Sequence, residues 1–175
     1  MSSVTVPLKK QIMLGVIGIT IILLVIEVFA NVWWITQIHC EFEQSEIFQN
    51  IDEVEKRQLC LDFYEVKTTG DVLIPSQRFD SIAINSLGFR GAEFSAIKPP
   101  DTYRIFTVGG STMFGAGATS DETTIPGYLQ QLLNEKEFGF DIEVINSGIQ
   151  GADSNKESKL IEQKLVRFSP DLIII

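Results

Sequence analysis

A long apolar run near the N-terminus constrains this chain more than any other feature. No charged residue occurs from Ile12 to Ile26, and apolar character resumes from Val28 to Ile38. As a helix, this stretch would be about 40 Å long and would cross a hydrocarbon core of about 30 Å with some tilt. The sequence therefore predicts a transmembrane helix over residues 11–38.

The charges on either side of the run predict its orientation. Lys9 and Lys10 precede it, whereas three glutamates follow it within residues 41–46. Because positive charge is retained on the cytoplasmic side, residues 1–10 are expected in the cytoplasm and the rest of the chain outside it. We therefore expect a single-pass protein of the cell membrane whose C-terminal part is extracytoplasmic.

Two observations leave room for alternatives to this anchor. Glu27 interrupts the run, and a carboxylate at the bilayer centre costs roughly 2.5 to 3.5 kcal/mol, so it must snorkel, be protonated or pair with another helix. Val28-Phe29-Ala30 also offers small residues where a signal peptidase cleaves. Cleavage near Ala30 would give a secreted protein instead of an anchored one.

The remainder of the chain is acidic and rich enough in apolar residues to form a core. The whole chain has a net charge of -9, and every charged residue except Lys9, Lys10 and Glu27 follows the run. This charge repels phosphate, so nucleic acid is excluded as a partner. Cys40 and Cys60 are too few for a disulfide scaffold or a zinc site, and whether they pair stays open.

Residues 39–100 are expected to form a stalk and a partly β lead-in. Ile47, Ile51 and Val54 repeat at helical spacing, which predicts an amphipathic stalk helix over residues 45–58. After it come β-prone runs and turn signals, and Lys98-Pro99-Pro100 marks a boundary. The β-prone runs lie at 60–66, 71–74 and 81–85, and the turn signals at 69–70 and 86–88.

Residues 101–175 alternate between strand and helix patterns. Strands are predicted over 103–108 and 142–146 and from residue 172 onward. One helix should begin near Pro126, with Leu129, Leu132 and Leu133 on its apolar face, and the next at a capping box of Ser154 and Glu157, with Leu160, Ile161, Leu165 and Phe168 facing the core. This order predicts an α/β fold, the start of a doubly wound parallel sheet.

The glycine-rich loop after the first of these strands, GGSTMFGAG at 109–117, excludes several kinds of site. It has no Gly-Lys-Ser/Thr, and its glycine spacing does not fit a dinucleotide fingerprint, so a nucleotide-binding domain is disfavoured. The glycine that an α/β-hydrolase elbow needs two residues after Ser111 is missing.

Three blocks in order resemble another family. RIFTVGGSTMFG (104–115), EVINSGIQGADS (143–154) and PDLIII (170–175) resemble the SGNH (GDSL-like) hydrolase superfamily, in the variant with Gly-Gly-Ser in the first block. INSLGFRG (84–91) and the anchor are similar to its membrane-tethered prokaryotic members. The resemblance implies a three-layer, flavodoxin-like α/β/α domain over residues 101–175 and no metal or cofactor. It also implies an esterase or acyl-transfer activity on an ester-bearing small molecule, lipid or glycan.

The resemblance assigns roles to five residues. Ser111 would be the nucleophile that forms an acyl-enzyme, and its own backbone N–H and that of Gly151 would donate to the oxyanion. Asn146 would brace the oxyanion loop and contribute to the substrate site. Gly109 and Gly110 would shape the turn that presents Ser111.

The chain also departs from the family pattern. The family has a Gly-x-Asn-Asp block after the third strand and an Asp-x-x-His block that supplies the base, and neither occurs here. The one histidine, His39, borders the anchor and is not expected to act as the base. We therefore expect the N-terminal part of a longer hydrolase, inactive by itself. The alternative is a non-catalytic, membrane-tethered binding or interaction module on the same fold.

Overall fold

The computed structural model describes residues 7–37, 40, 42 and 45–175. The chain forms two compact units, Met1–His39 and Cys40–Ile175. His39, to which the sequence assigned no catalytic role, lies outside the described residues.

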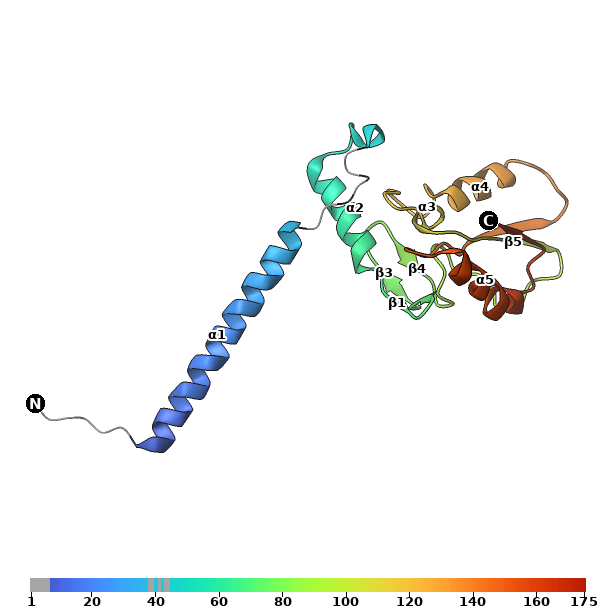
Figure 1. The fold of residues 1–175 in the computed structure, drawn as a ribbon. Helices are drawn as coiled ribbons and strands as arrows, with labels where there is room; N and C mark the ends of the chain where they lie inside the picture. The colour runs from blue at the N-terminus through green and yellow to red at the C-terminus, as the bar shows by residue number, and fades with distance from the viewer. Residues whose placement is uncertain (1–6, 38–39, 41, 43–44) are drawn as a thin grey trace, which may run out of the picture. The chain divides into compact units, whose positions relative to one another are not determined.

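The first unit contains one long helix, α1 (Leu8–Gln37) (Figure 1). Within it, Leu8–Trp34 is a 27-residue stretch of mean hydropathy 2.8, and none of its most apolar window is buried against other parts of the protein. Length and composition therefore fit one membrane-crossing helix or a signal sequence, as the apolar run predicted.

The second unit begins with a short 3-10 turn, η2 (Glu46–Phe48), and a helix, α2 (Glu53–Glu65). The predicted stalk helix over 45–58 is therefore wrong for residues 45–52 and confirmed for residues 53–58, although the helix continues to Glu65. The Asp52 carboxylate accepts from the backbone N–H groups of Val54 and Glu55 at 2.8 and 2.9 Å, which starts the helix at Glu53. The β-prone run 60–66 is also corrected, because nearly all of it continues this helix.

Two small antiparallel hairpins follow α2. The first joins β1 (Thr68–Thr69) to β2 (Val72–Leu73), and the second joins β3 (Gln77–Arg78) to β4 (Ala83–Ile84). Gly70 turns the first hairpin at φ +59, a conformation that glycine adopts without strain. The β-prone runs at 71–74 and 81–85 are thus confirmed, although each strand is only two residues long.

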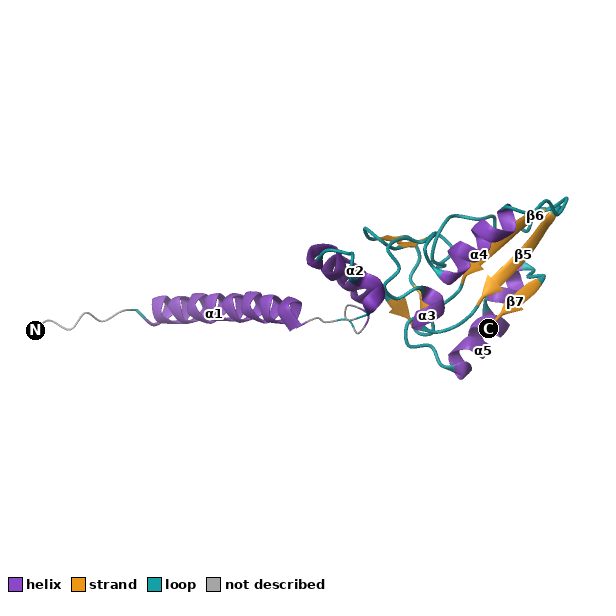
Figure 2. Cartoon of the chain, turned by 90° about the horizontal axis from the view of Figure 1, so that it is seen from above, coloured by secondary structure: helices purple, strands orange, loops and turns teal. Residues whose placement is uncertain are grey.

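A three-stranded parallel sheet forms the rest of the unit. Its order is β6-β5-β7, with β5 (Thr102–Thr107) between β6 (Asp141–Asn146) and β7 (Leu172–Ile174) (Figure 2). A short helix, α3 (Ser111–Phe114), and α4 (Ile125–Asn134) connect β5 to β6. A longer helix, α5 (Ser154–Gln163), and a 3-10 turn, η3 (Leu165–Phe168), connect β6 to β7. Figure 1 shows α4 and α5 on opposite sides of β5, so the predicted α/β class with a parallel sheet is confirmed.

The helix starts follow local capping chemistry. At α4, the Thr124 hydroxyl accepts from Gly127 N–H at 3.1 Å, and Pro126 lies in the first turn as predicted. At α5, Asp153 is the N-cap instead of Ser154, because its carboxylate accepts from Lys156 N–H at 3.0 Å. One expected core contact of α4 is also wrong, since Leu132 is 59% exposed.

One hydrophobic core joins the lead-in to the sheet. Val66, Leu73 and Phe89 from the lead-in pack in the same cluster as Phe106 of β5 and Leu165 of η3. Leu160 is buried in this cluster, and Ile161 and Phe168 pack against it, as the helical pattern predicted. Residues 40–100 are therefore part of the body that carries the sheet.

Candidate functional site

Ser111 lies where β5 ends at the carboxyl edge of the parallel sheet. It is the first residue of α3, it is exposed to solvent, and Gly110 before it is in an extended conformation. Neither the hydroxyl nor the backbone N–H of Ser111 makes a hydrogen bond to any described residue. Both groups are therefore free to contact a ligand.

Two glycines allow the turn around Ser111 to pack tightly. A Cβ at Gly109 would lie 2.7 Å from Cβ of Met113, and one at Gly148 would lie 2.1 Å from the backbone nitrogen of Phe114. Gly109 thus permits the turn to fold onto α3, and Gly148 permits the loop after β6 to touch the α3 backbone. At Gly110 an added Cβ would approach the Ala152 carbonyl only to 3.4 Å.

Asn146, the last residue of β6, joins the two loops. Its buried side chain donates from Nδ2 to the Phe114 carbonyl at 3.1 Å and accepts at Oδ1 from Gly148 N–H at 2.9 Å. Ile149 N–H also donates to the Gly109 carbonyl at 2.9 Å. The loop that carries Ser111 and the loop that carries Gly151 are therefore fixed against each other.

Gly151 lies at the exposed tip of the second loop. Its φ of +66 is in the left-handed region, where a side chain would be strained. Its carbonyl accepts from the Lys156 ammonium at 3.0 Å, whereas its N–H has no partner in the described part of the chain. An unpartnered N–H on an exposed tip, in a conformation that only glycine adopts easily, suits contact with a bound group.

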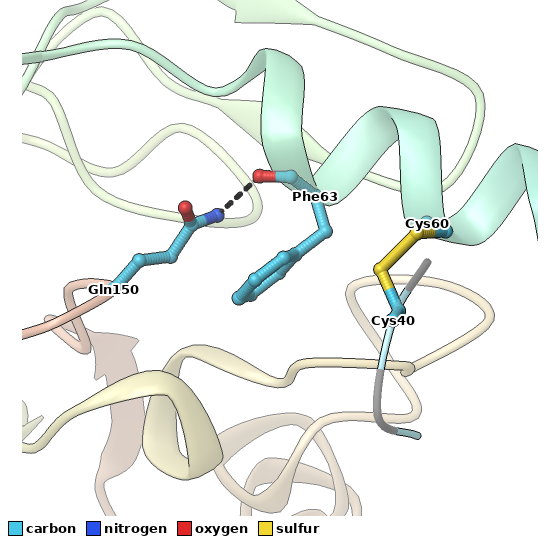
Figure 3. Close-up of a disulfide and its surroundings, with 4 residues drawn as sticks. All are labelled: Cys40, Cys60, Phe63 and Gln150. Carbon is cyan, nitrogen blue, oxygen red and sulfur yellow. Dashed lines mark hydrogen bonds between the residues drawn. A yellow bond between two sulfur atoms is a disulfide. The ribbon is translucent and has the colours of Figure 1, made fainter. Parts of the chain in front are cut away.

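Helix α2 supports both loops from one side (Figure 3). The Gln150 side chain donates to the Phe63 carbonyl at 2.6 Å, and the Phe63 ring packs against that of Phe114 with ring centroids 6.1 Å apart. A disulfide joins Cys60 of α2 to Cys40, with Cα atoms 5.7 Å apart. The sequence had left open whether these two cysteines pair. Both cysteines are buried.

A buried arginine fixes the C-terminal end of α3. Arg90 donates to the Asp121 carboxylate at 2.7 Å and to the carbonyls of Phe114 and Gly115 at 3.1 and 2.9 Å. Burial lowers the pKa of Arg90 from its ordinary value, and the Asp121 carboxylate opposes this shift. The buried, charged guanidinium therefore holds the loop 114–121 against the sheet.

A cavity of about 390 Å³ lies beside β6 and α4. Arg90, Asp121, Gln130 and Asn146 are among its lining residues, and neither Ser111 nor Gly151 is. The Gln130 side chain bonds to Val144 N–H at 2.7 Å and to the Ile142 carbonyl at 2.9 Å, which closes part of the outer edge of β6. Among the candidate site residues, the cavity therefore contacts only Asn146.

The structure thus brings together the five residues that the sequence singled out: Gly109, Gly110, Ser111, Asn146 and Gly151. Sequence reasoning assigned no role to Arg90, Gln150 or Gly148, which hold these loops in place. All three lie inside the sequence blocks that carry the resemblance, but no sequence signal indicated their distant partners. Within the described residues, no group of three or more His, Cys, Asp or Glu is arranged to hold a metal ion.

Comparison with known proteins does not assign the chain to a family. No model of a known protein family matches it, and a search of curated proteins finds no significant relative. The evidence for function is therefore the geometry of the loops themselves.

Proposed function

We propose that this chain carries the nucleophile half of a membrane-anchored, extracytoplasmic serine hydrolase of the SGNH type. It would hydrolyse or transfer the acyl group of an ester on a small molecule, a lipid or a glycan. Ser111 Oγ attacks the carbonyl carbon, its proton passes to a base, and the alcohol leaves as the acyl-enzyme forms. Water or a second alcohol then releases the acyl group.

One observation carries the proposal. The Gly-Gly-Ser turn after β5 and the Asn-Ser-Gly-Ile-Gln-Gly loop after β6 bond to each other at the carboxyl edge of a parallel sheet, where ligands bind in folds of this class. Free N–H groups of Ser111 and Gly151 on these two loops suit the charge that develops on the carbonyl oxygen. Asn146 holds the loops together without leaving a polar group exposed to substrate.

The disulfide supports the extracytoplasmic placement. Disulfides persist in oxidising compartments, and Cys40–Cys60 lies directly after the apolar helix. The lysines before α1 and the acidic residues after it favour the same orientation. Anchorage by α1 is part of the proposal, and cleavage near Ala30 would instead release the same domain.

The reaction also requires a base, which contributes typically 10² to 10⁴-fold to such a step. No described residue hydrogen-bonds to the Ser111 hydroxyl. The resemblance places this base in an Asp-x-x-His block, so the first thing to determine is whether the gene encodes such a block. A downstream Gly-x-Asn-Asp block followed by Asp-x-x-His would support the active form of the proposal.

A serine-reactive fluorophosphonate tests the nucleophile directly. The gene product, with any sequence encoded beyond residue 175, should be labelled at Ser111, and Ser111→Ala should abolish the label. Ser158→Ala, a change of an exposed serine on α5, is the matched control and should label like the unmodified protein. Labelling that survives Ser111→Ala would contradict the proposal.

The free Ser111 hydroxyl also favours a second candidate function, a membrane-tethered binding module that uses the same loops without chemistry. This candidate predicts no labelling at Ser111. It further predicts that Ser111→Ala leaves the fold intact but weakens capture of a partner from the membrane fraction. Labelling at Ser111 would exclude it.

A further inference from the structure

The apolar helix α1 carries a polar stripe that anchoring alone does not explain. Between Ile12 and Val32, three residues have polar side chains: Thr20, Glu27 and Asn31. At 100° per residue they lie within about 40° of one another on the helix surface. Polar side chains inside a membrane generally face protein and seldom face lipid.

Two residues of the stripe, Thr20 and Glu27, lie on a continuous heptad seam, and Asn31 borders it. Every seventh residue from Met13, together with the residue three positions later, falls on one narrow face of the helix. The members of this seam are Met13, Val16, Thr20, Leu23, Glu27, Ala30 and Trp34. Ala30 is small, so a neighbouring helix can approach closely beside Glu27. A seam of period seven is the pattern by which two helices pack with a left-handed crossing.

Hydrogen bonding within α1 leaves two groups of the stripe without a partner in the described part of the chain, the Glu27 carboxyl and the Asn31 side-chain oxygen. The Thr20 hydroxyl donates to the Val16 carbonyl at 2.9 Å, and the Asn31 amide donates to the Glu27 carbonyl at 2.8 Å. The Glu27 carboxyl makes no hydrogen bond in the described part of the chain. It lies seven residues before Trp34, so it is about 10 Å inside the apolar stretch.

A second copy of the same helix would present polar groups to Glu27 and Asn31 at the same depth in the membrane. The Asn31 amide has a second N–H besides the one bonded within its own helix, so Asn31 of one copy can donate to the Glu27 carboxyl of the other. Identical flanking residues place both copies at the same depth and in the same orientation. A different partner would need a polar or basic group in lipid at this same level.

We propose that α1 self-associates in the membrane as a parallel pair through the seam that contains Thr20, Glu27 and Ala30. The inference rests on the membrane anchor of the proposed function and does not depend on catalysis. Two copies of the extracytoplasmic unit would then be held beside each other. Gly18 lies on the opposite face of the helix, Gly15 lies outside the seam, and neither takes part in the pair.

Cysteine cross-linking of the full chain in native membranes tests the pair. Under a mild oxidant, Leu23→Cys on the seam should give a reducible dimer, and Ile22→Cys, which lies outside the seam, should not. Adding Glu27→Leu to Leu23→Cys should lower the cross-linked fraction about threefold or more, whereas Glu27→Gln, which still donates and accepts, should retain it. Gly18→Leu should leave the cross-link unchanged.

Membrane insertion is measured on the same samples by alkaline carbonate extraction. If the unmodified chain is extracted, the anchor itself is wrong and the pair is excluded with it. If every variant stays in the membrane but Leu23→Cys and Ile22→Cys cross-link equally or not at all, only the pair is wrong. A cross-linked product of another mass would show a different partner on the seam and would also overturn the proposal.

Discussion

The side chain of Gln150 donates from Nε2 to the backbone carbonyl of Phe63 at 2.6 Å, across 87 positions of sequence (Figure 3). This bond joins the loop that carries Gly151 to the last turns of α2. The Phe63 ring meanwhile contacts Phe114 at the end of α3. A single residue of α2 therefore contacts both loops of the candidate site.

Replacing Gln150 should loosen the second loop. Gln150→Ala removes one partly buried hydrogen bond, so we expect a loss of about 1 kcal/mol in the free energy of unfolding. Amide hydrogen exchange should rise over residues 147–152 and stay unchanged in α4. Gln163→Ala, an exposed glutamine at the end of α5, is the matched control. Unchanged exchange in Gln150→Ala would show that the bond does not hold the loop.

A side chain at position 148 should be poorly tolerated. In Gly148→Ala the new Cβ would lie 2.1 Å from the Phe114 nitrogen, so α3 and the loop after β6 must separate. We expect the free energy of unfolding to fall by about 1 to 3 kcal/mol, measured by pulse proteolysis in urea. Gly110→Ala meets only an ordinary contact and should cost less than half as much. Equal losses would argue against close packing at Gly148.

Removing the disulfide should destabilise the whole second unit. Cys40 and Cys60 are 20 positions apart, and a cross-link of this size contributes about 3 kcal/mol by restricting the unfolded chain. The double change Cys40→Ser with Cys60→Ser should lower stability by this amount in pulse proteolysis. Since both cysteines are buried, a thiol reagent should label the native chain only after reduction under unfolding conditions. Ready labelling of the native protein would show that the two are not paired.

Arg90 should be among the most sensitive positions of the fold. Arg90→Met leaves the Asp121 carboxylate without its cation and removes one of the donors to each of the carbonyls of Phe114 and Gly115. We expect a loss of about 3 to 5 kcal/mol, with Arg90→Lys only partly restoring stability. Arg167→Met changes an exposed arginine of η3 and should cost under about 0.5 kcal/mol. A similar loss in both variants would refute this role.

Lys164 should make the free energy of unfolding increase as the pH becomes alkaline. Burial lowers the pKa of Lys164 to about 8 from 10.5, although its ammonium donates to the Gly88 carbonyl at 2.9 Å. Between these two pH values the unfolded chain binds the proton more tightly than the folded chain, so stability increases as the pH rises. The increase is at most about 3 kcal/mol.

The measurement compares unfolding free energies from pH 7 to pH 10.5 in the unmodified chain and in Lys164→Met. Other groups titrate over this range in both proteins, so the difference between the two curves isolates Lys164. We expect stability to rise relative to the variant above about pH 8. Parallel curves would show that Lys164 is protonated equally easily in the folded and unfolded states.

Short-range signals in the sequence predicted most of the sheet and its turns. The runs that became β5 and β6 are mostly apolar, end in glycine-rich loops and are separated by a helix with Pro126 in its first turn. The same signals failed around α2, where the β-prone run 60–66 forms a helix because Asp52 caps it and Leu59 and Cys60 are buried on one side. Local preference is weak for such short runs, and tertiary packing decides between the two structures.

The sequence by itself determined the features that depend on chain neighbours. These are the apolar length of α1, the strand-loop-helix order after residue 101, and the placing of Ser111 and Gly151 in loops that follow strands. Only the tertiary structure decided which distant groups meet: Cys40 with Cys60, Arg90 with Asp121, and Gln150 with Phe63. The physical reason is that the packing of whole helices and strands decides which buried polar groups and thiols meet. Residue spacing along the chain does not encode that packing.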